Sequence, residues 1–211
     1  MQFADIIGQK ETKQQLAELV QHNRLSHALL FLGKEGSGSL SLAIAFAQYV
    51  VCEKVNGGKS GVGSQESGPS LFGEPENSNV EPPTLNDSCG VCPACQKAQQ
   101  LIHPDIHFSY PTVTKKPGEK PVATDFITDW REFVKLSPYG NSYDWIEQIK
   151  EKENSQGKIT AEECNDIIRK LSLKSFESVY KILIMWMPEM LGTEGNKLLK
   201  LIEEPPPNTL F

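Results

Sequence analysis

The chain has 211 residues, of which 38% are hydrophobic and 23% are charged, as is usual for a soluble globular protein with one sizeable core. The formal net charge of −6 argues against a free-standing nucleic-acid-binding protein, which usually carries an excess of basic residues. No apolar run approaches the ~18 residues of a membrane span, and the first residues lack the charged-then-apolar order of a signal peptide. We therefore expect a cytoplasmic protein with no membrane partner.

The first quarter of the chain predicts a helix, a strand, a glycine-rich turn and a second helix. Apolar residues recur at helical spacing over residues 16–25, and Glu11 and Thr12 stand near the expected helix start. Residues 27–33 form a short apolar run that ends in glycine, which is typical of a buried parallel strand. Residues 39–51 predict a helix packed against that strand. This order of elements is the setting of a phosphate-binding loop.

The glycine-rich turn departs from the phosphate-loop pattern G-x-x-x-x-G-K-[ST] at its two chemical positions. The loop residues are Gly33, Gly36, Ser37, Gly38, Ser39 and Leu40. Ser39 stands where the lysine neutralises phosphate charge, and Leu40 stands where a hydroxyl binds Mg²⁺, so ATP turnover is not expected. The backbone amides of residues 36–38 still permit weak binding of an anion or nucleotide at a helix N-terminus. A glycine turn without any ligand is the alternative.

Beyond this helix, helices and strands alternate, after an interruption. Residues 56–88 are rich in Gly, Ser, Pro and Asn, and we expect them to form a flexible insertion. Strands are then expected at 106–111, 179–187 and 209–211, and helices at 95–102, 125–135, 143–152, 159–175 and 196–204. Thr160 and Glu163 predict a capping box at one helix start, and aromatic pairs at 130/133 and 143/145 predict anchors for two helices. This alternation indicates an α/β domain with a mostly parallel sheet.

Three of the five cysteines, Cys89, Cys92 and Cys95, lie in the sequence CGVCPAC, which contains two overlapping C-x-x-C units. In a reducing compartment such crowding indicates metal ligation rather than disulfide formation. The alternatives are a redox pair, or a metal site that His103 or Cys164 completes.

The ordered set of motifs resembles the AAA+ module of bacterial DNA polymerase III clamp-loader subunits. The matching stretches are FADIIGQ, LSHALLFLGKEGSG, CGVCPACQKAQQLIHPD, ITAEECNDIIRKL, YKILIMWMPEML and NKLLKLIEEPPPNTLF. The resemblance leaves out residues 56–88 and about 111–158. It implies a P-loop-type parallel sheet flanked by helices, with a small inserted zinc module over residues 52–95. It also implies that residues 1–211 are the N-terminal AAA+ module of a longer protein, without its lid and C-terminal domains.

The resemblance also implies site residues. In active members of the family, the strand after a lysine ends in an Asp that holds Mg²⁺ and a Glu that activates water. Trp186 and Met187 occupy these two positions, so both halves of the metal site are apolar. The family pattern takes a fourth zinc ligand from the end of the preceding helix, where Cys52 stands. Together with Cys89, Cys92 and Cys95, it would give a closed structural Zn²⁺ site.

These departures are most similar to those of the delta-prime type of subunit, which need not hydrolyse ATP. The resemblance therefore implies a scaffold that works with delta and gamma/tau subunits, and that meets the sliding clamp and primed DNA through the complex. Two alternatives remain open at this point. One is an active gamma/tau-type ATPase with an unusual loop, and the other is a zinc-stabilised adaptor outside replication.

Overall fold

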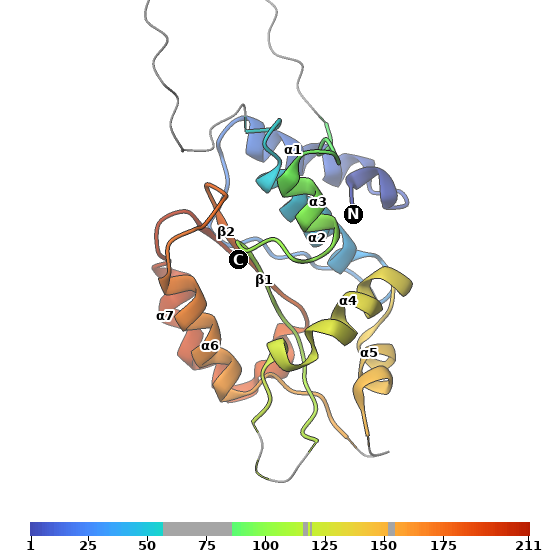
Figure 1. Cartoon of the computed structure of the whole chain (residues 1–211), viewed down its shortest axis with the longest axis vertical. Helices are drawn as coiled ribbons and strands as arrows, with labels where there is room; N and C mark the ends of the chain where they lie inside the picture. Colours follow the sequence, from blue (N-terminus) through green and yellow to red (C-terminus); the bar gives the residue numbers. More distant parts are fainter. Residues whose placement is uncertain (57–85, 116–117, 119, 152–154) are drawn as a thin grey trace, which may run out of the picture.

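The computed structural model of the chain describes residues 1–56, 86–115, 118, 120–151 and 155–211 (Figure 1). Its centre is a parallel three-stranded sheet with the order β1 (Ile106–Ser109), β2 (Lys181–Met185) and β3 (Thr209–Leu210). Ile106 of β1 lies opposite Ile182 of β2, and Ile182 lies opposite Leu210 of β3. The structure thus confirms an α/β fold with a parallel sheet.

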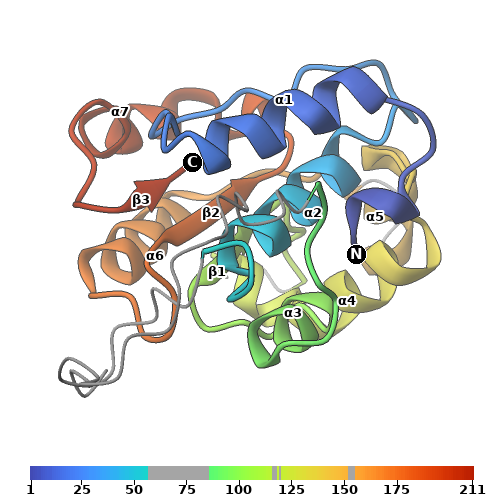
Figure 2. The same ribbon diagram turned by 90° about the horizontal axis from the view of Figure 1, so that it is seen from above.

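Helices cover both faces of this sheet. The α-helices are α1 (Lys10–Gln21), α2 (Ser39–Val51), α3 (Pro93–Gln99), α4 (Ile127–Leu136), α5 (Ser142–Ile149), α6 (Ala161–Ser172) and α7 (Asn196–Glu203). Short 3-10 helices span Phe3–Asp5 (η1), Ala123–Phe126 (η2) and Pro188–Gly195 (η3). The pair α6 and α7 lies on one side of the sheet, and α2, α3 and α4 lie on the other (Figure 1, Figure 2).

The two faces of β2 explain its continuous apolar sequence. Ile182 and Ile184 point into the larger hydrophobic core, which they share with α2, α3 and α4. Leu183, between them, points into a smaller core formed with α6 and α7. Because successive side chains of a strand point to opposite faces, a central strand covered on both sides favours the unbroken apolar run that follows Lys181.

Helix α2 is buried almost all round. It spans the predicted residues, Ser39–Val51, and ten of its thirteen residues are buried. Its first turn follows the glycine loop and its C-cap is Cys52. This one helix therefore connects the two regions that the sequence marks as candidate sites.

Other element boundaries differ from the sequence predictions for local reasons. Helix α1 ends at Gln21 rather than near residue 25, because Asn23 adopts a left-handed conformation with φ of 53°. The predicted capping box of α6 is half wrong. The Thr160 hydroxyl accepts the N–H of Glu163, as expected, but the Glu163 carboxylate is turned inward and accepts the N–H of Ala123 at 2.7 Å.

The prediction of a buried strand at residues 27–33 is also wrong. These residues, all of which the structure describes, form no assigned strand. They nevertheless pair with Phe211 through the hydrogen-bond pattern of parallel strands. The Leu29 N–H donates to the Phe211 carbonyl and the Phe211 N–H donates to the His27 carbonyl, each at 2.8 Å. Leu30 and Leu32 are 80% and 89% exposed, since they point away from the core on the outer side of the sheet edge.

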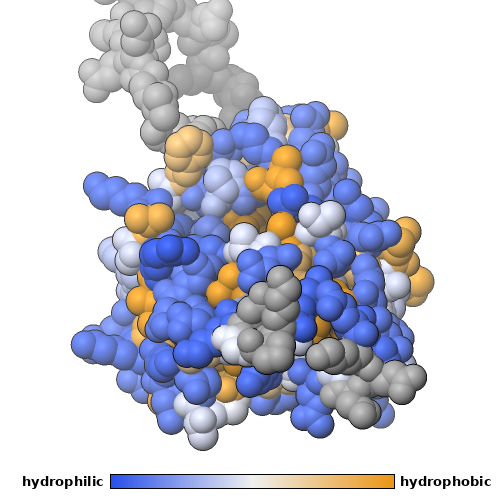
Figure 3. Space-filling view, turned by 60° about the horizontal axis from the view of Figure 1, so that its bottom comes forward, coloured by the Kyte–Doolittle hydropathy of each residue, from blue (hydrophilic) through white to orange (hydrophobic). Residues whose placement is uncertain are grey.

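The surface is mostly hydrophilic on the face seen in Figure 3, as expected for a chain in which 23% of the residues are charged. The hydrophobic residues on this face form small separate groups. Among the described residues, no helix is both long enough and apolar enough to span a bilayer. The predicted insertion at 56–88 lies almost entirely outside the described residues.

Candidate functional site

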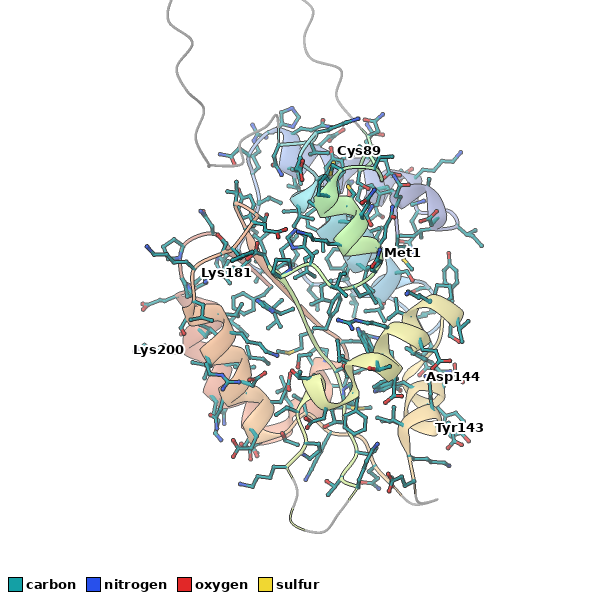
Figure 4. The ribbon with its side chains drawn as sticks, in the orientation of Figure 1. Met1, Cys89, Tyr143, Asp144, Lys181 and Lys200 are labelled. Carbon is teal, nitrogen blue, oxygen red and sulfur yellow. The ribbon has the colours of Figure 1, made fainter. Side chains whose placement is uncertain are left out.

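The four cysteines Cys52, Cys89, Cys92 and Cys95 come together in one cluster. Their sulfur atoms all lie within 4.8 Å of one another. Cys52 is the C-cap of α2, Cys92 is the N-cap of α3 and Cys95 lies in the first turn of α3. Cys89 lies on the loop that precedes α3, close to the start of that helix (Figure 4). The group is positioned to bind a metal ion.

Contacts within the cluster shift the pKa values of its thiols in different directions. The backbone N–H of Cys89 donates to the Cys52 sulfur at 3.3 Å, and that of Cys92 donates to the Cys89 sulfur at 3.4 Å. A hydrogen bond with Cys95, supported by the Cys89 N–H, lowers the pKa of Cys52 to about 4 against the opposing effect of burial. Burial raises the pKa of Cys92, and the hydrogen bond with Cys52 raises the pKa of Cys95. Metal binding needs the deprotonated thiol, so Cys92 and Cys95 would have to release their protons when a metal ion binds.

The two alternative ligands lie elsewhere. His103 is buried, and its Nδ1 accepts the N–H of Asp105 at 3.2 Å. Cys164 lies in the smaller core, where its thiol donates to the carbonyl of Glu194. Within the described part of the chain, neither residue belongs to the cysteine cluster.

A carboxylate that the sequence analysis missed ties the cluster to the start of the chain. Asp87 accepts the backbone N–H groups of Phe3 and Ala4 at 3.0 and 2.9 Å, so it caps the 3-10 helix η1. The next residue, Ser88, accepts a hydrogen bond from Gln48 of α2 at 3.0 Å. Asp87 stands at the end of a low-complexity stretch, and no spacing in the sequence pairs it with residues 3 and 4.

Replacing Asp87 with Ala is expected to release the first residues from the cysteine cluster. Two charge-assisted hydrogen bonds are lost, so the free energy of unfolding should fall by about 1–3 kcal/mol. Urea unfolding measures this change, and hydrogen exchange should show faster exchange at Phe3 and Ala4. Glu132→Ala is the matched control, because Glu132 is an exposed carboxylate on α4. Equal stability of the two variants would contradict the capping role.

The glycine loop leads directly into the first turn of α2. Gly38, the N-cap of α2, has φ of 78°, in the left-handed region that favours glycine. A side chain at Gly33 would place its Cβ 2.2 Å from the Ser37 hydroxyl, so the Ser37 side chain would have to move to admit it. The Gln9 side chain donates to the Ser37 carbonyl and ties the loop to the residue before α1.

A cavity of about 200 Å³ joins the loop to the end of β2. The loop residues from Gly33 to Leu40 line one wall, and residues 138–142 line another. Trp186 and Met187, directly after β2, complete the lining with Glu189. The structure therefore brings the two predicted halves of the nucleotide site around one cavity, although they lie about 150 residues apart in the sequence.

The side chains at the four positions that would serve a metal–phosphate complex carry no charge, although Lys34, Glu35 and Glu189 also line the cavity. Ser39 carries no charge and Leu40 has no oxygen for Mg²⁺. Trp186 is only 8% exposed, and its ring centroid lies 5.4 Å from that of Trp130 and 5.7 Å from that of Phe133. Met187 is in the left-handed region, with φ of 55°, as the N-cap of η3. The groups at this cavity that could meet an anion are therefore the backbone N–H groups of the loop and the Lys34 side chain.

Comparisons with known proteins point to one family. A family model described as "DNA polymerase III, delta subunit" matches residues 8–68 and 58–211. DNA polymerase III subunit tau/gamma from Haemophilus influenzae is 44% identical over 50 residues. That alignment covers 24% of this chain and only 7% of the Haemophilus protein. Because the family model matches nearly the whole sequence, the chain belongs to the DNA polymerase III delta subunit family.

Proposed function

We propose that the chain is a clamp-loader subunit of the delta-prime kind, a scaffold that does not hydrolyse ATP itself. The observation that carries this proposal is one cavity at which the four positions that the chemistry requires all hold apolar or neutral side chains, although Lys34, Glu35 and Glu189 also line it. Ser39 and Leu40 stand on one wall and Trp186 and Met187 on the other. Phosphoryl transfer needs the lysine, the metal and the positioned water together, so losses on both walls leave no partial catalyst.

The resemblance and the fold support the assignment of the site residues. We assign Gly33 to Leu40 as a degenerate phosphate loop of a P-loop-type AAA+ module over residues 1–211. We assign Trp186 and Met187 as the degenerate positions of its metal- and water-binding strand. The cysteine cluster, within residues 52–95, would hold a structural Zn²⁺, because four thiolates satisfy a tetrahedral ion and leave no position open for substrate.

The proposed partners follow from the role in the loader. Other clamp-loader subunits, of the delta and gamma/tau kinds, would supply ATP hydrolysis. The sliding clamp and primed DNA would be met through the assembled complex, which agrees with the acidic net charge of −6. The similarity to the tau/gamma subunit supports one competing function, which is an active ATPase of the gamma/tau type.

The test is ATP hydrolysis by the isolated full-length protein. We expect no magnesium-dependent hydrolysis above the background of the assay. The double variant Ser39→Lys with Leu40→Thr should gain affinity for nucleotide but remain inactive, because Trp186 and Met187 still provide neither metal ligand nor base.

The assembled loader supplies the positive control, since the wild-type protein should support ATP-dependent clamp loading there, driven by its neighbours. Hydrolysis by the isolated wild-type protein, free of other subunits, would refute the scaffold role and favour the active ATPase.

A further inference from the structure

The short connection between α4 and α5 crosses the glycine loop. Its central residue, Tyr139, accepts the backbone N–H of Ile7 at its hydroxyl, at 2.8 Å. The Tyr139 ring lies against Gly38, where a Cβ would come within 2.7 Å of Cε1. The hydroxyl of Ser41 in α2 donates to the carbonyl of Pro138. The connection thus contacts the loop, the first turn of α2 and the segment before α1.

The connection is itself held in place at both ends. Gly140 N–H donates to the Ser137 carbonyl at 2.9 Å, and Asn141 and Asp144 form a reciprocal capping box at the start of α5. A side chain at Gly140 would meet the Phe133 ring of α4 at 2.8 Å, so the turn packs closely on that helix. The position of Tyr139 is therefore fixed by short-range contacts that do not involve the glycine loop.

Helices α4 and α5 are fixed on the sheet by an aromatic cluster. The Trp130 ring of α4 stacks on Tyr110 with centroids 4.0 Å apart, and Trp145 of α5 meets Trp130 edge-on at 5.3 Å. The Trp145 indole donates to the carbonyl of Pro111 at 2.7 Å. Trp130 also packs against Trp186, so the same two-helix unit contacts both walls of the cavity.

We propose that the unit α4–α5, residues 127–149, is an internal clasp that holds the glycine loop in one conformation without a bound nucleotide. Tyr139 is the contact residue. The inference rests on the proposed non-hydrolysing role and explains how such a subunit keeps an ordered loop. In an active nucleotide site the phosphate groups contact the loop, whereas here the Tyr139 ring contacts Gly38. Two hydrogen bonds, from Ile7 and from Ser41 of α2, hold the connection in place over the loop.

Hydrogen exchange of the full-length protein tests the clasp without any need for nucleotide. Tyr139→Ala should speed amide exchange over residues 33–40 and at Ile7 by about tenfold or more, because local opening no longer has to displace the ring. Tyr139→Phe keeps the ring and should speed exchange at Ile7 alone. Tyr143→Ala is the matched control, since Tyr143 lies in the same unit, is 69% exposed and points outward from α5 (Figure 4).

Two results would overturn the inference. The first is an unchanged loop in Tyr139→Ala, or exchange that rises by the same factor in β2, which would make Tyr139 a contributor to global stability only. The second is slower exchange of residues 33–40 in the wild-type protein when ATP and Mg²⁺ are added, which would show that a ligand orders the loop. ATP hydrolysis by the wild-type protein would refute the proposed function and leave these exchange results to be judged separately.

Discussion

Cys92→Ser protein is expected not to hold the zinc ion that we propose for the cysteine cluster, and to unfold about 6–12 °C below the wild type. In zinc-finger peptides a structural Zn²⁺ contributes about 10–16 kcal/mol to folding. This chain has its own hydrophobic core, so we expect about a quarter of that effect, or about 3 kcal/mol. A domain of this size loses about 2–4 °C of its midpoint per kcal/mol.

The effect should be local as well as large. The cluster joins the end of α2 to the start of α3, so those elements should loosen while β1 and β2 stay folded. Metal analysis of the wild type should give about one Zn per chain. Cys164→Ala, which removes a buried thiol outside the cluster, should keep the metal. A wild-type protein that contains no metal and whose midpoint ignores chelators would disprove the structural site.

Trp186→Asp is expected to lower the free energy of unfolding by more than about 4 kcal/mol. The substitution introduces the acid that we propose this position has lost, but it removes a ring that packs against both Trp130 and Phe133. Truncating a buried aromatic residue costs about 3–5 kcal/mol, and a carboxylate among aromatic rings adds its desolvation penalty. Urea unfolding monitored by tryptophan fluorescence and by circular dichroism measures the loss.

Met187→Glu gives the matched comparison at the next position. Met187 is half-buried at the edge of the cavity, so a charged end can reach water and the cost should stay below about 1 kcal/mol. Similar losses for the two variants would show that Trp186 is not held by the aromatic cluster. The expected difference means that an acid is costly at position 186, where the side chain belongs to the core, and is tolerated at position 187.

The sequence predicts well those features that depend on neighbours in the chain. The bounds of α2 follow from Gly38 before it and the end of its apolar run, and the parallel strands follow from short apolar segments between helices. The cluster around Cys89, Cys92 and Cys95 follows from its spacing, although the fourth position came from the family pattern rather than from spacing.

Features that depend on distant contacts were missed. The Glu163 carboxylate does not cap its own helix, because it accepts the buried N–H of Ala123, which lies 40 residues away in sequence. Tyr139 meets Gly38 across about 100 residues, and no periodicity in either segment predicts that contact. The exposed Leu30 and Leu32 show the same limit, since an apolar run indicates a strand without telling whether other elements cover it.

The thirteen residues of α2 fix both the distance and the relative rotation between the glycine loop and the cysteine cluster. Each residue of an α-helix adds about 1.5 Å of length and about 100° of rotation. Deleting a single residue within α2 would therefore turn Cys52 by more than a quarter of a circle while Gly38 kept its place. Either the glycine loop or the cysteine cluster must then lose its geometry. The spacing of 14 positions between Gly38 and Cys52 therefore constrains the length of the helix, and no substitution within the helix can relieve that constraint.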